Sequence, residues 1–495
     1  MYATRGFGLS EIGDVEVFPR DDELHLFHLT LPNHDVVQHL VATDGLAWRL
    51  LPPALRTGDP GACDDDQIWT MSVTERNGRY AMLYTALSIA DGGRVQRTAL
   101  ATSGDLLTWT KSDRNPVGEA DPRWYEADAG ASDTVSWRDP KPVLVGDTYY
   151  AAVCAREKGG PLLRRGCVGL LASTDLEHWE PRPPLFAPRR FWDLECPQVF
   201  PIGDRWYLTA AIMEDRTQRY WVAPDFHGPY ETPPDGGVLA PLGHYAGRIC
   251  RWRGLDIFCC WHQPRAVNRN AEPVPAVDWT TVRNPFGKFI PAPLVLLPRP
   301  DGSLACHSFP GWSAYRTADP LPILPASPSL CHARSTDDSD WSVDGRDGSF
   351  DVLASREPAT DVWFEGVLSL RATSGGLAFR LDDEGGGYFV TIQAGSREVL
   401  LHKCLPTRDP HDGRRWFRYL EVQRGQLPRP VLAGEPIRFR LLIAGAYVEC
   451  ALDDEVVIAT LSAERTVGKL GIWAESGRLS ATDVRAAPMR LPEHR

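Results

Sequence analysis

Three acidic residues each open a strand-like apolar run, and their recurrence suggests that they act together. Asp14 lies in Gly-Asp-Val-Glu-Val-Phe, Asp139 in Trp-Arg-Asp-Pro-Lys-Pro-Val, and Glu195 in Glu-Cys-Pro-Gln-Val-Phe. A single acid that opens a strand is usually a turn or capping residue, so the argument rests on the recurrence. Three carboxylates in one concavity would raise the pKa of one and leave another ionised, which provides an acid and a nucleophile or base. Cleavage of a glycosidic bond requires that pair, and a third carboxylate can bind sugar hydroxyls.

A sequence repeat predicts the elements that bring these acids together. Segments that resemble one another and end in an aromatic residue are Ala42–Trp48, Ala101–Trp109, Ala172–Trp179 and, in degenerate form, Ala223–Tyr230. Short β-type runs lie between them, each after a Gly or Asp turn, and long amphipathic helical patterns are absent. A unit of about 60 residues with several short strands is typical of a propeller blade, and a fifth unit fits residues 248–312. Because equivalent positions on successive blades face one central channel, the three acids should converge at one of its mouths.

The pattern changes after residue 318. The segment Asp319–Ser329 contains four prolines and indicates a linker. From Trp341 onward, alternating strands follow one another closely without the repeat, which indicates a β-sandwich of the jelly-roll or concanavalin-like type. The predicted fold class is therefore all-β: a five-bladed β-propeller catalytic domain over 1–318, a linker over 319–335 and a C-terminal β-sandwich over 336–495.

Composition narrows the classes of partner. The formal net charge is −12, so the general surface repels phosphate backbones and anionic lipid, and neither a nucleic acid nor a membrane is expected as a partner. The first residues lack a charged segment followed by an apolar one, so no signal peptide is visible and a cytoplasmic location is expected. The 11 cysteines form no Cys-x-x-Cys pair, and the sequence indicates no metal site and no cofactor.

The same residues resemble a known family. The Trp-Arg-Asp-Pro segment at 137–140, the Glu-Cys-Pro segment at 195–197, the Asp-Leu-x-x-Trp repeats and the segment Ile68–Ser72 are similar to glycoside hydrolase family 32, the invertase-like group of five-bladed propeller enzymes. The resemblance implies that Asp14 is the nucleophile, Asp139 the transition-state stabiliser and Glu195 the general acid/base. It also implies net retention, with the nucleophile and the acid/base about 5 to 5.5 Å apart.

Four further residues are candidates for substrate binding. Arg138 would keep Asp139 ionised, and Trp69 and Ser72 match a strand that lines the first sugar subsite in the family. His262 follows Trp261 in the fifth unit and could touch a substrate, although a lone histidine is usually a turn or core residue. The segment around Asp14 departs from the family's Trp-Met-Asn-Asp-Pro-Asn-Gly, which predicts altered contacts around the first sugar.

The expected function is a retaining glycosidase that acts on a furanoside, with a β-fructofuranoside such as sucrose or a short fructan as the leading substrate. Its expected partner is a small sugar or oligosaccharide, and the sandwich is a candidate surface for a homo-oligomer. Three alternatives stay open: a fructosyltransferase that forms oligosaccharides or anhydrides, an inverting arabinofuranosidase-like enzyme with carboxylates about 6.5 to 9.5 Å apart, and a non-catalytic carbohydrate-binding propeller.

Overall fold

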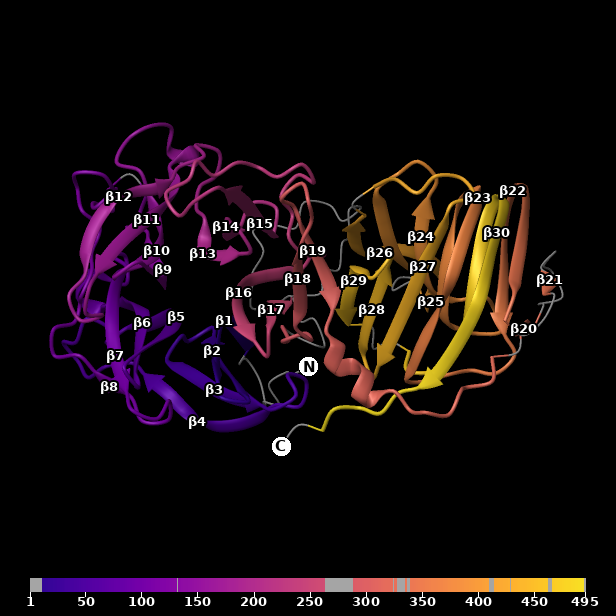
Figure 1. Cartoon of the computed structure of the whole chain (residues 1–495), viewed down its shortest axis with the longest axis horizontal. Coiled ribbons are helices and arrows are strands. Elements are labelled where there is room, and N and C mark those ends of the chain that lie inside the picture. Colours follow the sequence, from indigo (N-terminus) through magenta and orange to yellow (C-terminus); the bar gives the residue numbers. More distant parts are fainter. Residues whose placement is uncertain are drawn as a thin grey trace.

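The computed structural model consists almost entirely of antiparallel strands arranged in two bodies side by side (Figure 1). It describes residues 11–130, 132–262, 288–323, 325–326, 334–335, 339–408, 414–427, 429–461 and 465–493. Within these residues no helix is long and apolar enough to cross a membrane. The predicted all-β fold is confirmed.

Five consecutive groups of strands form the blades of the propeller in the described part of the chain. The first two blades are β1 (Glu11–Arg20), β2 (Glu23–Leu31), β3 (Val36–Ala42) and β4 (Arg49–Arg56), then β5 (Gln67–Arg76), β6 (Arg79–Leu87), β7 (Arg97–Ser103) and β8 (Thr110–Lys111). The third and fourth are β9 (Trp137–Val145), β10 (Thr148–Arg156), β11 (Gly166–Ser173) and β12 (Glu180–Phe186), then β13 (Glu195–Ile202), β14 (Arg205–Ile212) and β15 (Thr217–Ala223). The fifth is β16 (His244–Trp252), β17 (Leu255–His262), β18 (Leu294–Pro298) and β19 (Leu304–Ser308).

The first strand of each blade lies innermost, and these strands form a closed ring. β1 contacts β5, β5 contacts β9, β9 contacts β13, β13 contacts β16, and β16 contacts β1. β1 and β16 belong to different sheets, so in the described residues the ring is closed by packing between them and not by a shared sheet. This arrangement brings the start of every blade to the same central channel.

The sequence repeat is a recurring turn after the third strand of a blade. The Asp105 carboxylate accepts hydrogen bonds from the amides of Leu107 and Thr108, both at 2.8 Å, and the following Trp109 indole donates to the carbonyl of Leu106. Asp44 and Asp175 accept the same pair of amide bonds in blades one and three. An aspartate that bonds its own backbone two and three residues later is an Asx turn, which explains why Asp and the terminal aromatic recur together.

The second body is the C-terminal sandwich. Its strands are β22 (Trp341–Ser355), β23 (Val362–Leu381), β24 (Gly387–Gln393), β25 (Glu398–Arg408), β26 (Arg415–Gln426), β27 (Pro436–Ala444), β28 (Tyr447–Leu452), β29 (Glu455–Leu461) and β30 (Lys469–Pro488), with the short β20 (Pro325–Ala326) and β21 (Arg334–Ser335) on β22. The fifth blade continues into it through one pair, His307 of β19 opposite Glu455 of β29. Part of the predicted linker lies outside the described residues, and the predicted domain boundaries stay predictions.

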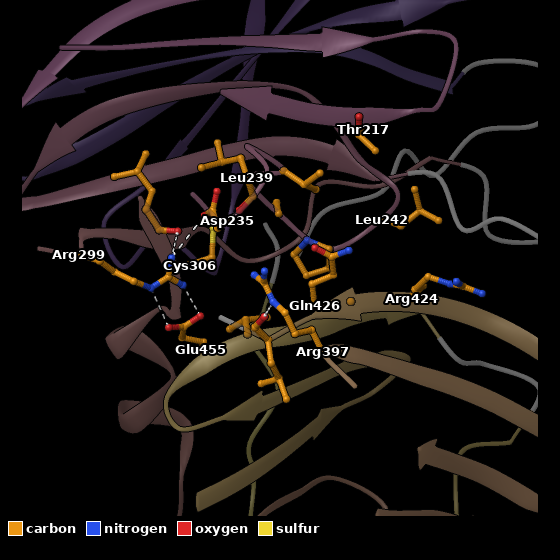
Figure 2. A pocket seen from close by; sticks show the side chains of 17 residues that line it. Thr217, Asp235, Leu239, Leu242, Arg299, Cys306, Arg397, Arg424, Gln426 and Glu455 are labelled. Carbon is orange, nitrogen blue, oxygen red and sulfur yellow. Dashed lines mark hydrogen bonds and ion pairs between the residues drawn. The ribbon is translucent and has the colours of Figure 1, made fainter. Parts of the chain in front are cut away.

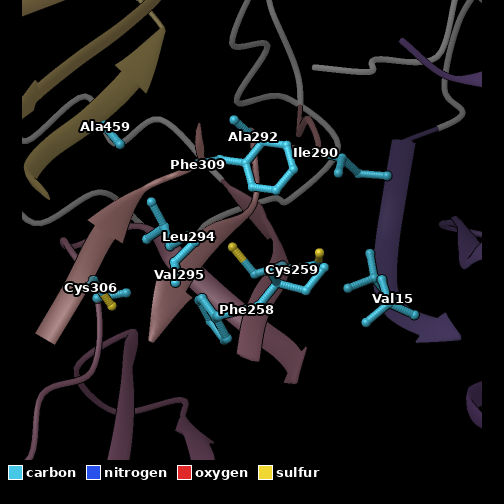
Figure 3. Close-up of a cluster of buried hydrophobic side chains, with 14 of the residues drawn as sticks. Val15, Phe258, Cys259, Ile290, Ala292, Leu294, Val295, Cys306, Phe309 and Ala459 are labelled. Carbon is cyan, nitrogen blue, oxygen red and sulfur yellow. The ribbon is translucent and has the colours of Figure 1, made fainter. Parts of the chain in front are cut away.

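A shared hydrophobic core joins the two bodies. Val15 of β1, Phe258 and Cys259 of β17, Leu294 of β18 and Ala459 of β29 belong to one buried cluster (Figure 3). A 3-10 helix, η3 (Pro310–Tyr315), follows the fifth blade, and its Trp312 stacks on Tyr447 of β28 with ring centroids 5.7 Å apart. The sandwich is therefore packed on the fifth blade through apolar side chains as well as through the β19–β29 pair.

Replacement of Trp312 by alanine should destabilise the whole chain. The indole is only 1% exposed, and loss of a buried Trp typically costs about 3–5 kcal/mol because it leaves a cavity. Chemical denaturation would measure the free energy of unfolding. Leu163→Ala, at a side chain that is 70% exposed, is the matched surface control and should change that free energy by no more than about 0.5 kcal/mol. Equal stability of the two variants would contradict the packing role of Trp312.

Candidate active site

The inner strands all carry an irregularity at the same height. The register of the antiparallel pairing shifts at one point in each of these strands. The shifts lie between Ile12 and Val15 in β1, Trp69 and Met71 in β5, Arg138 and Lys141 in β9, Glu195 and Gln198 in β13, and Tyr245 and Arg248 in β16. Bulges of this kind bend a strand and redirect a side chain, and they are common beside active sites. Asp139 and Cys196 sit within them at φ 62° and 47°. Non-glycine residues in this left-handed region cost of order 1–3 kcal/mol, which the surrounding structure must offset.

The structure brings the three predicted acids together at these bulges. One carboxylate oxygen of Asp14, one of Asp139 and the Sγ of Cys196 all lie within 4.8 Å of one another, and Glu195 directly precedes Cys196 in β13. Asp139 is only 2% exposed, whereas Asp14 and Glu195 are partly exposed. The two partly exposed carboxylates can meet a ligand in the channel, and Asp139 lies beneath them.

Hydrogen bonds hold Asp14 from two sides. The Trp261 indole of β17 donates to its Oδ1 at 3.0 Å, and the Thr70 hydroxyl of β5 donates to its Oδ2. The Cys196 Sγ lies 3.5 Å from the same Oδ2. These donors come from the second, fourth and fifth blades, so the orientation of Asp14 depends on closure of the ring.

Asp139 is held by the backbone. Its amide donates to the Thr85 hydroxyl at 2.9 Å, and its Oδ2 accepts from the amide of Cys196 at 2.8 Å. Burial raises the pKa of Asp139, and the Arg138 guanidinium, 3.5 Å away, opposes that rise. The arrangement fixes this carboxyl in one position.

Glu195 has the environment of an acid that gains and loses a proton near neutrality. Its Oε1 accepts from Arg138 Nη2 at 3.0 Å, and its Oε2 accepts from the Tyr245 hydroxyl. Burial raises the pKa of Glu195 to about 7; Arg138 and Tyr245 oppose that rise, and the nearby Asp139 and Asp14 add to it. A carboxyl with this pKa can donate a proton and later accept one at neutral pH.

Of the four residues predicted to bind substrate, Arg138 is placed among the acids, but it is buried. Its side chain is 6% exposed and contacts Asp139, Asp193 and Glu195. Trp69 is half-buried and donates to Gln67 at 2.6 Å, and Ser72 is fully buried. The residue of β5 that reaches Asp14 is Thr70, which lies between them.

The prediction that His262 binds substrate does not agree with its placement. Successive side chains of a strand point to opposite faces. Trp261 points to Asp14, and His262, 1% exposed, instead packs against His244 and lies 3.2 Å from the Gln423 side chain of the sandwich. His262 is therefore a core histidine in this structure.

Sequence reasoning missed Thr70, Tyr245 and Trp261. Thr70 lies inside the segment Ile68–Ser72 that carried the resemblance, and Trp261 directly precedes His262, so both had a signal nearby. Tyr245 lies near the start of the fifth blade, at the position where the first, third and fourth blades carry their acids, and this alignment could have identified it. Two cations lie on these aromatic rings: Arg216 over Tyr245 at 5.1 Å and Lys288 over Trp261 at 4.5 Å.

A separate cavity of about 180 Å³ lies between the propeller and the sandwich (Figure 2). Arg299 follows β18 and bridges Glu455 of β29, at 2.5 Å, and Asp235 of the fourth blade, at 3.4 Å. None of the three clustered acids lines this cavity. The Arg299–Glu455 ion pair joins the two bodies, and the clustered acids lie elsewhere.

Part of the propeller matches the model of a known protein family. Residues 17–226 match the model of the "Glycosyl hydrolases family 32 N-terminal domain", a range that includes Asp139 and Glu195 and starts three residues after Asp14. A beta-fructofuranosidase, insoluble isoenzyme CWINV5, of Arabidopsis thaliana is 30% identical over 180 residues, which are 34% of this chain and 29% of that protein. Insoluble isoenzyme 7 of Oryza sativa subsp. indica is 29% identical over 241 residues, 44% of this chain and 37% of that protein. The chain thus matches about a third of the length of these curated relatives.

Solved structures share the fold of the whole chain. Fructan 1-exohydrolase IIa from Cichorium intybus has a TM-score of 0.67 at 16% identity, covering 98% of this chain and 95% of that one. Exo-inulinase from Aspergillus awamori has a TM-score of 0.68 at 15% identity, covering 97% and 96%. At such identities the likeness concerns the fold, a propeller followed by a sandwich.

Proposed function

We propose that this chain hydrolyses β-fructofuranosides, such as sucrose or a short fructan, with net retention, because residues 17–226 match the model of the N-terminal domain of glycosyl hydrolases family 32. The observation that carries the proposal is the close placement of two partly exposed carboxyls with different surroundings. Asp14 is held by hydrogen-bond donors, whereas burial raises the pKa of Glu195 to about 7. The curated relatives that the chain resembles are named beta-fructofuranosidases.

In the proposed first step, Asp14 attacks the anomeric carbon of the fructosyl unit while Glu195 donates its proton to the departing glycosidic oxygen. The carbon–oxygen bond to the leaving sugar breaks, and an ester between Asp14 and the fructosyl unit forms. In the second step Glu195 takes a proton from water, the water oxygen attacks the anomeric carbon, and the ester bond to Asp14 breaks. Two inversions at the same carbon give retention.

The buried groups would support this reaction from below. Asp139 is fixed by the Cys196 amide and Arg138, and we propose that it accepts hydrogen bonds from sugar hydroxyls. Trp261 and Thr70 keep Asp14 in one orientation, so the attacking oxygen need not be ordered during the reaction.

The proposed function is tested by incubation of the purified chain with sucrose, 1-kestose, inulin and nitrophenyl furanosides. Release of fructose from at least one fructoside supports it, and sugar binding without any turnover would replace it with a carbohydrate-binding role. Added methanol tests the stereochemistry, because a retaining enzyme transfers the fructosyl unit to methanol as the β-methyl fructoside, whereas an inverting enzyme has no intermediate to transfer.

The pH dependence of kcat/KM should show a basic limb near pH 7. The first step needs Glu195 protonated, and a carboxyl with a pKa of about 7 loses its proton as the pH rises through that value. Activity should therefore fall above about pH 7, in an assay on sucrose with folding monitored by circular dichroism across the same range. Constant activity up to pH 9 by a folded enzyme would contradict the assignment of Glu195 as the acid.

The predicted homo-oligomer through the sandwich stays a prediction, which size-exclusion chromatography with light scattering would test.

A further inference from the structure

Asp193 is a buried carboxylate that lies just before β13 and bridges two arginines. It is 2% exposed. Its Oδ1 and Oδ2 accept from Nε and Nη2 of Arg156 at 2.9 and 3.0 Å, and Oδ2 also accepts from Nη2 of Arg138 at 2.9 Å. The Arg156 guanidinium is held in turn by the Trp192 ring at 4.1 Å. Asp193 is one hydrogen bond away from Arg138, which contacts Asp139 and Glu195.

Arg138 divides one nitrogen between Asp193 and Glu195. Its Nη2 donates to Asp193 Oδ2 at 2.9 Å and to Glu195 Oε1 at 3.0 Å. Its Nη1 donates to the Ser136 hydroxyl at 2.6 Å, which keeps the guanidinium plane in place. The positive charge of Arg138 favours ionisation of Glu195, and the negative charge of Asp193 on the same guanidinium opposes it.

We propose that Asp193 is a positioning residue for the reaction proposed above: it fixes Arg138, and its negative charge offsets part of the effect of that guanidinium on Glu195. This inference rests on the proposed function, because it concerns the acid/base of that same site.

The remaining groups around Glu195 determine the background against which Asp193 acts. They are Asp14 of β1, Arg138 and Asp139 of β9, Cys154 of β10, Cys196 of β13, Tyr245 of β16 and Arg216, whose guanidinium lies over the Tyr245 ring. In this set, the cation that contacts Glu195 is Arg138, at 3.0 Å. A change in how Arg138 is shared should therefore alter the proton affinity of Glu195 directly.

Asp193→Asn keeps the shape of the side chain and removes its charge. The positive charge of Arg138 would then act on Glu195 and Asp139 alone, which favours the ionised form of Glu195. The basic limb of kcat/KM should move to lower pH by about one unit, with a lower kcat at neutral pH. The matched control is Asp64→Asn in the second blade: Asp64 is equally buried and pairs with Lys111 and the Tyr84 hydroxyl, away from the three acids. Asp64→Asn should lower stability and leave the basic limb where it is.

Arg156→Gln provides a second variant with the opposite sign. Without Arg156, Arg138 is the remaining cation that contacts Asp193, so more of the negative charge of Asp193 acts on Glu195 and the basic limb should move to higher pH. Opposite shifts in the two variants support the inference. If one variant folds poorly, the direction of the shift in the other still tests it. Unshifted limbs in both, with only lower stability, would show that Asp193 has a structural role and would overturn the inference.

Stability against pH tests the same inference without turnover. The pKa of Glu195 is raised in the folded chain, so its contribution to stability is present at low pH and is lost as the pH rises from the unfolded value of about 4.3 toward about 7. The difference in unfolding free energy between the wild type and Glu195→Gln should therefore change across that pH window. When the same comparison is made in chains that carry Asp193→Asn, the upper pH limit of the window should be lower. An inactive wild type with this shift would refute the proposed function alone, whereas an active wild type without it would refute only the role of Asp193.

Discussion

Asp14→Asn should lose about 10⁴-fold or more in kcat on sucrose, because removal of one member of a nucleophilic unit typically costs about that much. Asparagine has nearly the same shape: its Oδ1 can still accept from Trp261, and its Nδ2 can donate to the Thr70 hydroxyl, so the fold should persist. What is lost is the charged oxygen that forms the ester. Steady-state kinetics with a thermal unfolding curve would separate chemistry from stability.

A matched control for Asp14 lies in the same blade. Asp22 lies in the turn between β1 and β2 with a side chain that is 91% exposed, and Asp22→Asn should leave kcat unchanged. In Asp14→Gly, added azide should restore product as the α-fructosyl azide, because the small anion attacks once from the vacated side. Wild-type activity in Asp14→Asn would refute the double displacement through this residue.

Glu195→Gln should lose about 10²- to 10⁴-fold on sucrose, the usual contribution of a general acid. The amide cannot protonate the departing oxygen, but its Oε1 can still accept from Arg138 and its Nε2 can donate to the Tyr245 hydroxyl. A nitrophenyl fructoside needs little protonation to leave, so the variant should lose far less in the first step on that substrate. The basic limb near pH 7 should also disappear.

Equal losses on sucrose and on the nitrophenyl substrate would argue against an acid role for Glu195. Exposed Glu180, which pairs only with Arg182 at 2.8 Å among the contacts described, is the control, and Glu180→Gln should behave as wild type on both substrates.

The propeller could be predicted from the sequence because its signal is local. Each Asp of the repeat bonds amides two or three residues away, as Asp105 does with Leu107 and Thr108, so the turn is encoded within a few residues. The acids could be aligned for the same reason, since each stands at a fixed distance before a turn and an aromatic strand. The predicted fold and the family resemblance were confirmed, and the roles of the individual acids stay proposals.

The contacts around the acids could not be predicted, because they depend on bulges and on pairs distant in sequence. Cys196 and Ala246 adopt positive φ without glycine, which leaves no mark in the sequence. Trp261 and His262 are adjacent in the sequence, and because they lie in a strand their side chains point to opposite faces of the sheet. The pairing of β19 with β29 consists of one pair of residues, His307 and Glu455, which are nearly 150 positions apart in the sequence. No local sequence pattern predicts such a pair.

The ring is closed by packing between the first blade, where the described propeller begins, and the fifth, where it ends. Asp14 lies in the first blade and Trp261 in the fifth, so their hydrogen bond spans this closure. Outside it, the Tyr315 hydroxyl of η3 reaches Asp44 in the first blade, and the Tyr315 carbonyl accepts from the amide of Arg490 just beyond β30. The sandwich is thereby tied to the first blade as well as to the fifth. Loss of these contacts would weaken the packing between the two blades beside Asp14 without any change to a group that touches the sugar.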